Sequence, residues 1–190
     1  MINNKLIIAV IMAFHLSLES CETFVGPDEP NMVIKDNFVL MSDGKLVPGF
    51  GMGLNDGAKK RDWIRGDSTS LKILYPGGLE WGGVFITVGG DPVDRLKPWI
   101  DISACSELSV VMKGETGGEE VFIGIKDKDD ENSETRKYVI LTDDWKVYQF
   151  SLSEFNTCSL SQVYVIPEFI FHSCADTAVS IEVKSITISK

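Results

Sequence analysis

The sequence predicts an all-β sandwich, on two observations. Nine short runs rich in β-branched and aromatic residues recur along the chain, separated by clusters of Gly, Asp, Asn and Ser. None of these runs sustains the 3.6-residue repeat of apolar positions that marks an amphipathic helix. Regularly spaced short strands of this kind are typical of a β-sandwich. The runs are MVIKDNFVLM, STSLKILY, GVFITV, LSVVMK, EVFIGIK, RKYVILT, KVYQFSL, QVYVIPEFIF and VSIEVKSITIS.

The N-terminal segment predicts export. Residues 1–20 carry one lysine, then a mostly apolar run and small residues, which is the layout of a signal peptide with an apolar run too short to span a bilayer. Leu18-Glu19-Ser20-Cys21 resembles a bacterial lipobox, in which the cysteine is acylated after cleavage, although Glu19 departs from that pattern. We therefore expect a lipid anchor on Cys21 at the bacterial cell envelope. Simple secretion, with Cys21 an ordinary cysteine, is the alternative.

Composition and charge describe the rest of the chain. The acidic, proline-bearing residues 21–31 are expected to form a tether, and residues 32–190 to form one domain. With 44% hydrophobic and 24% charged residues, the 190-residue chain has the composition of a globular protein. Its net charge of −10 argues against nucleic acid or anionic lipid as a partner, because there is no basic stripe to neutralise phosphates. Contact with a membrane is therefore expected only through the lipid anchor.

The four cysteines suggest a disulfide rather than a metal site. With Cys21 lipidated, we predict that Cys158 pairs with Cys174, because these two flank a single strand region, and that Cys105 is a buried thiol. Two disulfides formed by all four cysteines are the alternative. No CxxC or histidine-paired spacing occurs, so neither a zinc site nor a cysteine nucleophile is expected.

Alternation assigns side chains to faces in three of the runs, because successive side chains of a strand point to opposite sides. In the first two, EVFIGIK and YVIL, an aliphatic set predicts the core: Val121, Ile123, Ile125, Val139 and Leu141. The third run, VYVIPEFIF, places Val163, Val165, Phe169 and Phe171 opposite Tyr164, Ile166, Glu168 and Ile170. The face that mixes aromatic rings with Lys126 and Glu168 is typical of a partly solvated sheet surface.

Several motifs together resemble a known domain type. They are WGGVFIT, then DISACSELSVVMKGETGGEEVFIGIKD, then LTDDWKVYQFSLSEF and a closing Ile/Val strand. In order and spacing they are similar to a galactose-binding-like jelly roll, of the kind found in family-eleven-type carbohydrate-binding modules and related bacterial lipoprotein domains. The similarity covers roughly residues 32–190. It implies a jelly-roll fold and, for the better-known members, carbohydrate binding.

The resemblance also bears on calcium. Such domains often hold a structural calcium with acidic residues in the last strand, but Lys184 and Ser185 stand where acids are expected. A structural calcium at the last strand is therefore doubtful, and the sequence does not assign a metal elsewhere. The run DKDDENSE resembles the start of a calcium loop but lacks the glycine and the distant glutamate of an EF-hand, so a solvated hairpin turn is predicted instead. Asp43 is interpreted as an ordinary turn residue.

A sugar site needs aromatic rings for stacking and polar groups for the hydroxyls. Trp63 lies in the charged loop KKRDWIRGD, where we expect its ring to be exposed at the edge of a binding site. Trp81 is expected either to be a flat surface on which a sugar stacks or to pack within the sheet. Trp145 is predicted to be core, and Trp99 to pack under a loop. The mixed face is predicted to form a band that binds glycan, with a second small core as the alternative. The predicted ligand-binding residues are Trp63, Trp81, Phe122, Lys126, Tyr138, Tyr164 and Glu168.

The function predicted from these features is non-catalytic binding of a polysaccharide or glycan. His172 is the one histidine that remains after the signal peptide, and no GxSxG elbow occurs. A glycosidase would need two carboxylates flanking the sugar bond, and no pair stands out. The alternative from another class is a structural or assembly protein of the envelope that contacts another protein through the same sandwich.

Overall fold

The computed structural model describes residues 30–55, 62–66, 69–89, 97–129, 135–172 and 177–190. The predicted signal peptide, most of the tether, the lipidation site Cys21 and Cys174 lie outside these residues. Strands dominate the described part, and the one helical element in it is the single 3-10 turn Leu152–Glu154. No helix in this part is long and apolar enough to cross a membrane.

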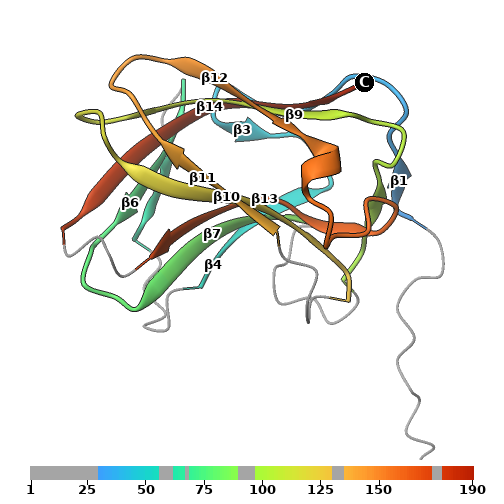
Figure 1. Ribbon diagram of the computed structural model, residues 1–190, viewed down its shortest axis with the longest axis horizontal. Coiled ribbons are helices and arrows are strands. Elements are labelled where there is room, and N and C mark those ends of the chain that lie inside the picture. Colours follow the sequence, from blue (N-terminus) through green and yellow to red (C-terminus); the bar gives the residue numbers. More distant parts are fainter. Residues whose placement is uncertain (1–29, 56–61, 67–68, 90–96, 130–134, 173–176) are drawn as a thin grey trace, which may run out of the picture.

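Two seven-stranded sheets are stacked face to face (Figure 1). In the first, sheet A, the strands pair in the order β4-β7-β13-β10-β11, while β8 also pairs with β13 and β1 pairs with β8. All of these pairs are antiparallel except β1–β8. The strands of sheet A are β1 (Met32–Val33), β4 (Phe50–Asn55), β7 (Trp81–Val88), β8 (Ile100–Asp101), β10 (Glu120–Asp127), β11 (Thr135–Ile140) and β13 (Val163–His172).

The second sheet, sheet B, has the long strand β14 in its middle. One side of β14 pairs with β9 along nearly its whole length, and the other side pairs first with β6 and then with β2. The edges are completed by β12 next to β9, β3 next to β2 and β5 next to β6. The strands of sheet B are β2 (Phe38–Ser42), β3 (Lys45–Leu46), β5 (Ile64–Gly66), β6 (Leu71–Tyr75), β9 (Glu107–Gly114), β12 (Lys146–Ser151) and β14 (Val179–Ser189).

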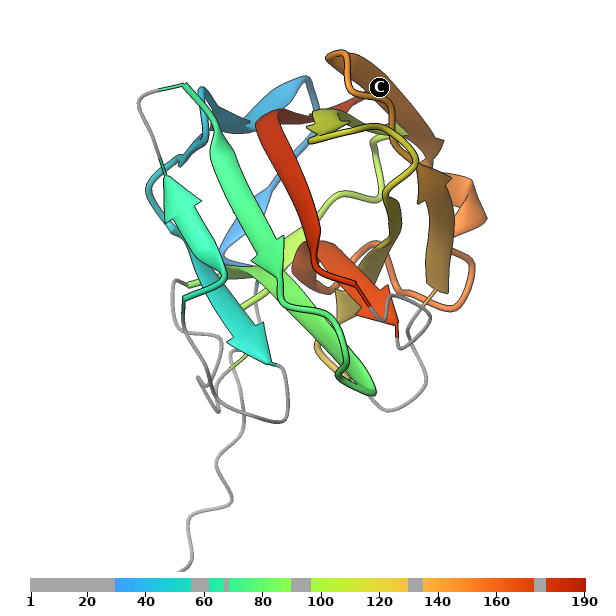
Figure 2. The ribbon, with the colours of Figure 1, turned by 90° about the vertical axis from the view of Figure 1, so that its left-hand side faces the viewer.

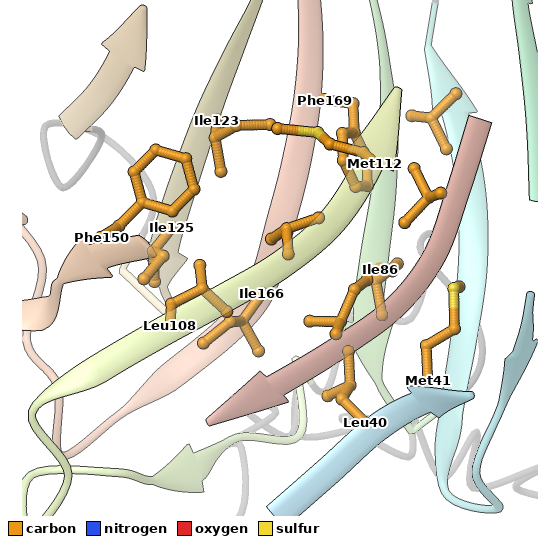
Figure 3. Packing of buried hydrophobic residues seen from close by; sticks show 14 of the residues in the cluster. Leu40, Met41, Ile86, Leu108, Met112, Ile123, Ile125, Phe150, Ile166 and Phe169 are labelled. Carbon is orange, nitrogen blue, oxygen red and sulfur yellow. The ribbon is translucent and has the colours of Figure 1, made fainter. Parts of the chain in front are cut away.

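The core lies between the two sheets, because each contributes one apolar face. Burial alternates residue by residue along β9, where Leu108, Val110 and Met112 are buried and their neighbours are less so. Figure 3 shows side chains of both sheets in this layer, among them Met112 from sheet B and Phe169 from sheet A. The predicted core residues of β10 and β11 are all buried. This confirms the assignment of faces in these two strands.

Every predicted run contains a strand, but four strands were not predicted. The most important is β4, whose sequence FGMGLN reads poorly as a strand because glycine weakens strand interiors. It forms because all six of its residues pair with β7. The short strands β3, β5 and β8 are held in the same way by longer neighbours. The Asp43-Gly44 turn between β2 and β3 agrees with the interpretation of Asp43, and both residues have positive φ.

The face assignment in β13 is partly wrong. Ile166 belongs to the buried cluster between the sheets, whereas Val165 does not. The pairing of β13 with β7 shifts register between Val165 and Glu168, and an irregularity of this kind reverses which side chains point inward. Phe169 and Phe171 beyond the shift lie in the cluster as the alternation predicts.

The cysteines differ from the predicted pairing. Cys158 is a free, buried thiol in the structure, whereas a disulfide with Cys174 was expected. Cys105 is also a free, buried thiol, as predicted. Burial, reinforced by the nearby charge of Asp127, raises the pKa of Cys158 to about 12. The thiol form of Cys158 is therefore strongly favoured at neutral pH.

We expect Phe169→Ala to lower the free energy of unfolding by about 3–5 kcal/mol, because it opens a cavity at a fully buried site. Urea denaturation of the mature protein measures this change. The control is Val147→Ala on β12, where the side chain is 59% exposed and a change within about 0.5 kcal/mol is expected. Equal losses in the two variants would contradict the assigned core.

We expect Cys158 to resist iodoacetamide at pH 8 in the native protein. With a pKa near 12, roughly one thiol in ten thousand is ionised at this pH, against about a quarter for an ordinary exposed cysteine. Peptide mass spectrometry after alkylation measures the modification. In urea without a reductant, Cys158 should become alkylated. If alkylation in urea instead required a reductant, Cys158 would be in a disulfide, as the sequence predicts.

Candidate ligand-binding face

The outer face of sheet A is built from side chains that strand pairing places in two adjacent rows. In the first row, Ile170 of β13 pairs with Phe122 of β10, which pairs with Tyr138 of β11. In the second row, Glu168 of β13 pairs with Gly124 of β10, which pairs with Arg136 of β11. The first row is apolar and the second is charged. Together they bring three of the predicted binding residues, Phe122, Tyr138 and Glu168, to one region.

The apolar row ends in exposed aromatic surface. Tyr138 is 48% exposed, and its ring lies 5.3 Å from that of Phe122 at an interplanar angle of 54°. Ile140, two residues further along β11, is also exposed. At the beginning of β7, Trp81 is 36% exposed. The face therefore offers two accessible rings, one on each side of β13 and β10.

The charged row is organised by Glu168, whose side chain has no solvent exposure. Its Oε1 accepts a hydrogen bond from Arg136 Nε at 3.0 Å, and its Oε2 lies 3.8 Å from Lys126 Nζ. The Glu168–Arg136 pair crosses the strand between them. A Cβ atom on Gly124 would lie 2.4 Å from Glu168 Oε1, so a side chain at this position would obstruct the crossing.

The two cations remain partly accessible. The side chains of Lys126 and Arg136 keep 19% and 26% of their surface exposed, while Glu168 keeps none. Lys126 Nζ also lies 5.7 Å from the centre of the Phe85 ring, a cation–π contact. Glu168 therefore orients two hydrogen-bond donors toward the surface of the sheet and does not itself reach solvent.

Trp63 does not belong to this face. It is only 2% exposed and packs edge-on against Tyr75, with ring centres 5.1 Å apart, and against Phe171. The six-membered ring of Trp63 lies over Gly82, where a Cβ atom would collide with it. The prediction of an exposed binding edge at Trp63 is therefore wrong. The missing side chain at Gly82 allows the tryptophan to enter the space between the sheets.

Two further aromatic predictions are corrected. Tyr164 is buried at 4% exposure, so it offers no surface to the band. Trp145, predicted to be core, is 40% exposed, and Lys113 Nζ and Lys184 Nζ lie 5.3 and 6.0 Å from its ring centre. Trp145 precedes the edge strand β12 of sheet B, which leaves its ring on the surface between lysines. Trp99 is buried, as predicted.

Arg136 was missed by the sequence analysis, although a signal for it exists. Arg136, Tyr138 and Ile140 alternate along one strand, so a face that carries Tyr138 also carries Arg136. Its pairing with Glu168 follows only from the three-strand order, which the sequence does not reveal.

Within the described ranges, no group of three or more His, Cys, Asp or Glu side chains could hold a metal ion. Most of the acidic run after Asp127 lies outside those ranges. The backbone of His172 ends β13 opposite Trp81.

No family model matches the chain, and no curated protein matches it in sequence. Several solved structures share its fold. A family 11 carbohydrate-binding module from Clostridium thermocellum, in complex with a β-1,3-1,4-mixed-linked tetrasaccharide, has a TM-score of 0.57 and 15% identity over 82% of this chain and 96% of that chain.

Two other families show the same likeness. A family 30 carbohydrate-binding module of a cellulosomal cellulase from Clostridium thermocellum has a TM-score of 0.57 and 20% identity over 81% of this chain and 97% of that chain. A family 29 module complexed with mannohexaose has a TM-score of 0.55 and 12% identity over 80% and 89%. The predicted jelly-roll sandwich is thereby confirmed as the fold.

We expect Arg136→Met to lower the free energy of unfolding by about 3 kcal/mol, because it removes a hydrogen-bonded cation from a buried carboxylate. The neighbouring Lys137→Met is the matched control. Lys137 pairs with Glu154 at 2.9 Å, but Glu154 is 55% exposed, so a loss below about 1 kcal/mol is expected. Urea denaturation compares the two variants, and similar losses would mean that Glu168 does not depend on Arg136.

Proposed function

We propose that this protein binds glycan chains on the outer face of sheet A without altering them chemically. The observation that carries the proposal is the pair of exposed rings, Trp81 and Tyr138, on the face where Lys126 and Arg136 present hydrogen-bond donors. Aromatic rings stack on the apolar side of a pyranose, and fixed donors bind its hydroxyl oxygens. The fold it shares with modules solved in complex with oligosaccharides supports this reading.

The spacing of the rings favours a chain over a single sugar. Trp81 and Tyr138 belong to β7 and β11, which are separated by β13 and β10. Three inter-strand spacings amount to roughly 14 Å. A ligand that touches both rings must therefore extend across the sheet. Mixed-linked glucan and mannohexaose are suitable first probes, because the modules of similar fold were solved with ligands of these types.

The position of Glu168 favours binding over catalysis. Hydrolysis of a glycosidic bond uses two carboxyl groups that flank the bond and reach the sugar directly. Glu168 is buried beneath the face and held by Arg136 and Lys126, so it is poorly placed to exchange protons with a bound glycan. Its role in this proposal is to orient the two cations.

The predicted signal peptide and the predicted lipidation of Cys21 complete the proposal. A secreted or lipid-anchored module would hold glycan at the bacterial cell envelope, through the tether formed by residues 21–31. Globomycin treatment of the producing cells, followed by mass spectrometry of the N-terminal peptide, distinguishes a lipidated Cys21 from a simple secreted chain.

A second candidate function is protein contact in the envelope. It is favoured by β11, which pairs only with β10 among the described strands and carries exposed Tyr138 and Ile140. An edge strand with exposed apolar side chains can accept a partner strand. Concentration-dependent oligomers in size-exclusion chromatography, abolished by Ile140→Lys, would favour this function.

We expect Trp81→Ala and Tyr138→Ala each to weaken glycan binding by roughly 3- to 10-fold, because each removes one stacking surface. Affinity electrophoresis in mixed-linked glucan and calorimetry with mannohexaose measure the change. Trp145→Ala is the matched control, since Trp145 is about as exposed as Trp81 but directly precedes β12 of sheet B. It should bind like the unmodified protein.

Two outcomes would contradict the proposed face. One is binding that survives the Trp81→Ala, Tyr138→Ala double variant. The other is a loss in Trp145→Ala equal to that in the sheet A variants. Circular dichroism of each variant ensures that a loss of binding does not reflect unfolding.

A further inference from the structure

The edge strand β12 of sheet B pairs only with β9 among the described strands. All six of its residues are in register with β9, without a bulge. On the right of Figure 2, β12 lies on the same side of the sandwich as β11. Proteins protect sheet edges with short strands, prolines, bulges or charges, because an open edge accepts another strand. The other edge strands of sheet B, β3 and β5, are two and three residues long, whereas β12 is longer and contains no proline.

The outward backbone groups of β12 belong to three alternate residues. Leu152 N, directly after the strand, donates to Ser106 O at 2.8 Å and so continues the β12–β9 register. Hydrogen bonds toward one neighbour recur at every second residue of an antiparallel strand. The N–H and C=O groups of Val147, Gln149 and Ser151 therefore point away from β9. Within the described ranges, no backbone hydrogen bond joins these groups to another element.

The charge of β12 suits pairing with an identical strand. The chain has a net charge of −10, but β12 contains no acidic residue and one basic residue, Lys146. In an antiparallel pair centred on Gln149, the two Lys146 side chains lie at opposite ends. Like charges that face each other directly across two strands destabilise the pair, and this arrangement avoids them within β12.

The exposed side chains of β12 also suit a second copy. Gln149 Nε2 donates to Glu107 Oε1 at 3.2 Å, which leaves a second N–H and the amide oxygen for another partner. Two facing glutamines can exchange these groups. Val147 is 59% exposed, and in the same arrangement it faces the small Ser151 of the second copy.

We propose that two copies of this protein pair through β12, antiparallel and about a twofold axis at Gln149. Gln149 then faces Gln149 of the second copy, and Val147 faces Ser151 of the second copy. Each facing pair exchanges two backbone hydrogen bonds, so all three outward residues are used. Sheet B continues from one copy into the other.

The dimer has a consequence that rests on the proposed function of sheet A. The twofold axis of an antiparallel strand pair is perpendicular to the sheet, so corresponding faces of the two copies point to the same side. Both outer faces of sheet A are then on one side of the dimer. A polysaccharide bound at two such faces is held more tightly than at one, because the second contact is intramolecular.

The test is sedimentation velocity of the mature protein with Cys21→Ser, which excludes association through a lipid. The sedimentation coefficient should rise from that of a monomer to that of a dimer between about 1 and 500 μM. Gln149→Pro should raise the dissociation constant at least about 10-fold, because proline removes an N–H that β9 does not use. Gln149→Ala keeps this N–H and is the matched control, with a change below about 3-fold.

A second pair of variants tests the register even where Gln149→Pro fails to fold, which circular dichroism detects. Gln149→Lys and Gln149→Glu each place two like charges opposite each other at the twofold axis, so each variant alone should stay monomeric. A mixture of the two should associate, because a lysine then faces a glutamate. Sedimentation of the separate and mixed samples measures this.

Each outcome decides the proposal. A protein that is monomeric over the whole concentration range overturns it. Dimers that Ile140→Lys abolishes and Gln149→Pro leaves intact place the contact at β11 and also overturn it. Mixed lysine and glutamate variants that do not associate overturn the register at Gln149.

Glycan binding separates this proposal from the function proposed for sheet A. Gln149→Pro should bind mannohexaose like the unmodified protein, yet be retarded roughly 10-fold less in mixed-linked glucan gels. Equal retardation would overturn the bivalent arrangement. A dimer that binds neither ligand would overturn the glycan face and leave the pairing through β12 supported.

Discussion

A carboxylate with no access to solvent determines the arrangement of the outer face of sheet A. Burying a charge costs several kcal/mol unless the charge is paired and hydrogen-bonded, so Glu168 requires Arg136 and Lys126 close by. Arg136 is two strands away, and the contact is made across Gly124. The order of β13, β10 and β11 and their register are thus tied to one ion pair. Glu168 also holds Lys126 near the surface, while Arg136 lies two residues from the exposed Tyr138 on β11.

Glycines inside strands make room for large side chains from other elements at several places in this fold. Gly82 accommodates the ring of Trp63, which therefore lies between the sheets, and Gly114 accommodates the carboxylate of Glu119. Both side chains line a cavity of about 480 Å³ at one end of the sandwich, the end cavity. The outer face extends across several strands and presents Lys126 and Arg136 beside the buried Glu168, whereas the cavity is lined by three carboxylates and one arginine.

Much of the fold and part of the candidate site could be predicted from local patterns. Alternation correctly separated Val121, Ile123 and Ile125 from Phe122 and Lys126, because a strand obeys a two-residue period whatever it pairs with. The same rule failed at Val165 and Ile166, where a register shift with β7 interrupts the period. Burial of the tryptophans was least predictable. Trp63 looked exposed because its neighbours are charged, and Trp145 was expected to be buried because the domains that the sequence resembles bury a tryptophan where this strand begins.

The sequence by itself determined the all-β class, the strands with clear alternation and the exposed position of Tyr138, because all of these depend on residues close together along the chain. The tertiary structure decided which strands become neighbours, and so decided that Arg136 rather than solvent meets Glu168 and that Trp63 packs against Gly82. It also created the end cavity, whose walls come from β5, β6, β14 and the β9–β10 turn. Contacts between residues so far apart in the chain depend on sheet order and register, which no local pattern encodes.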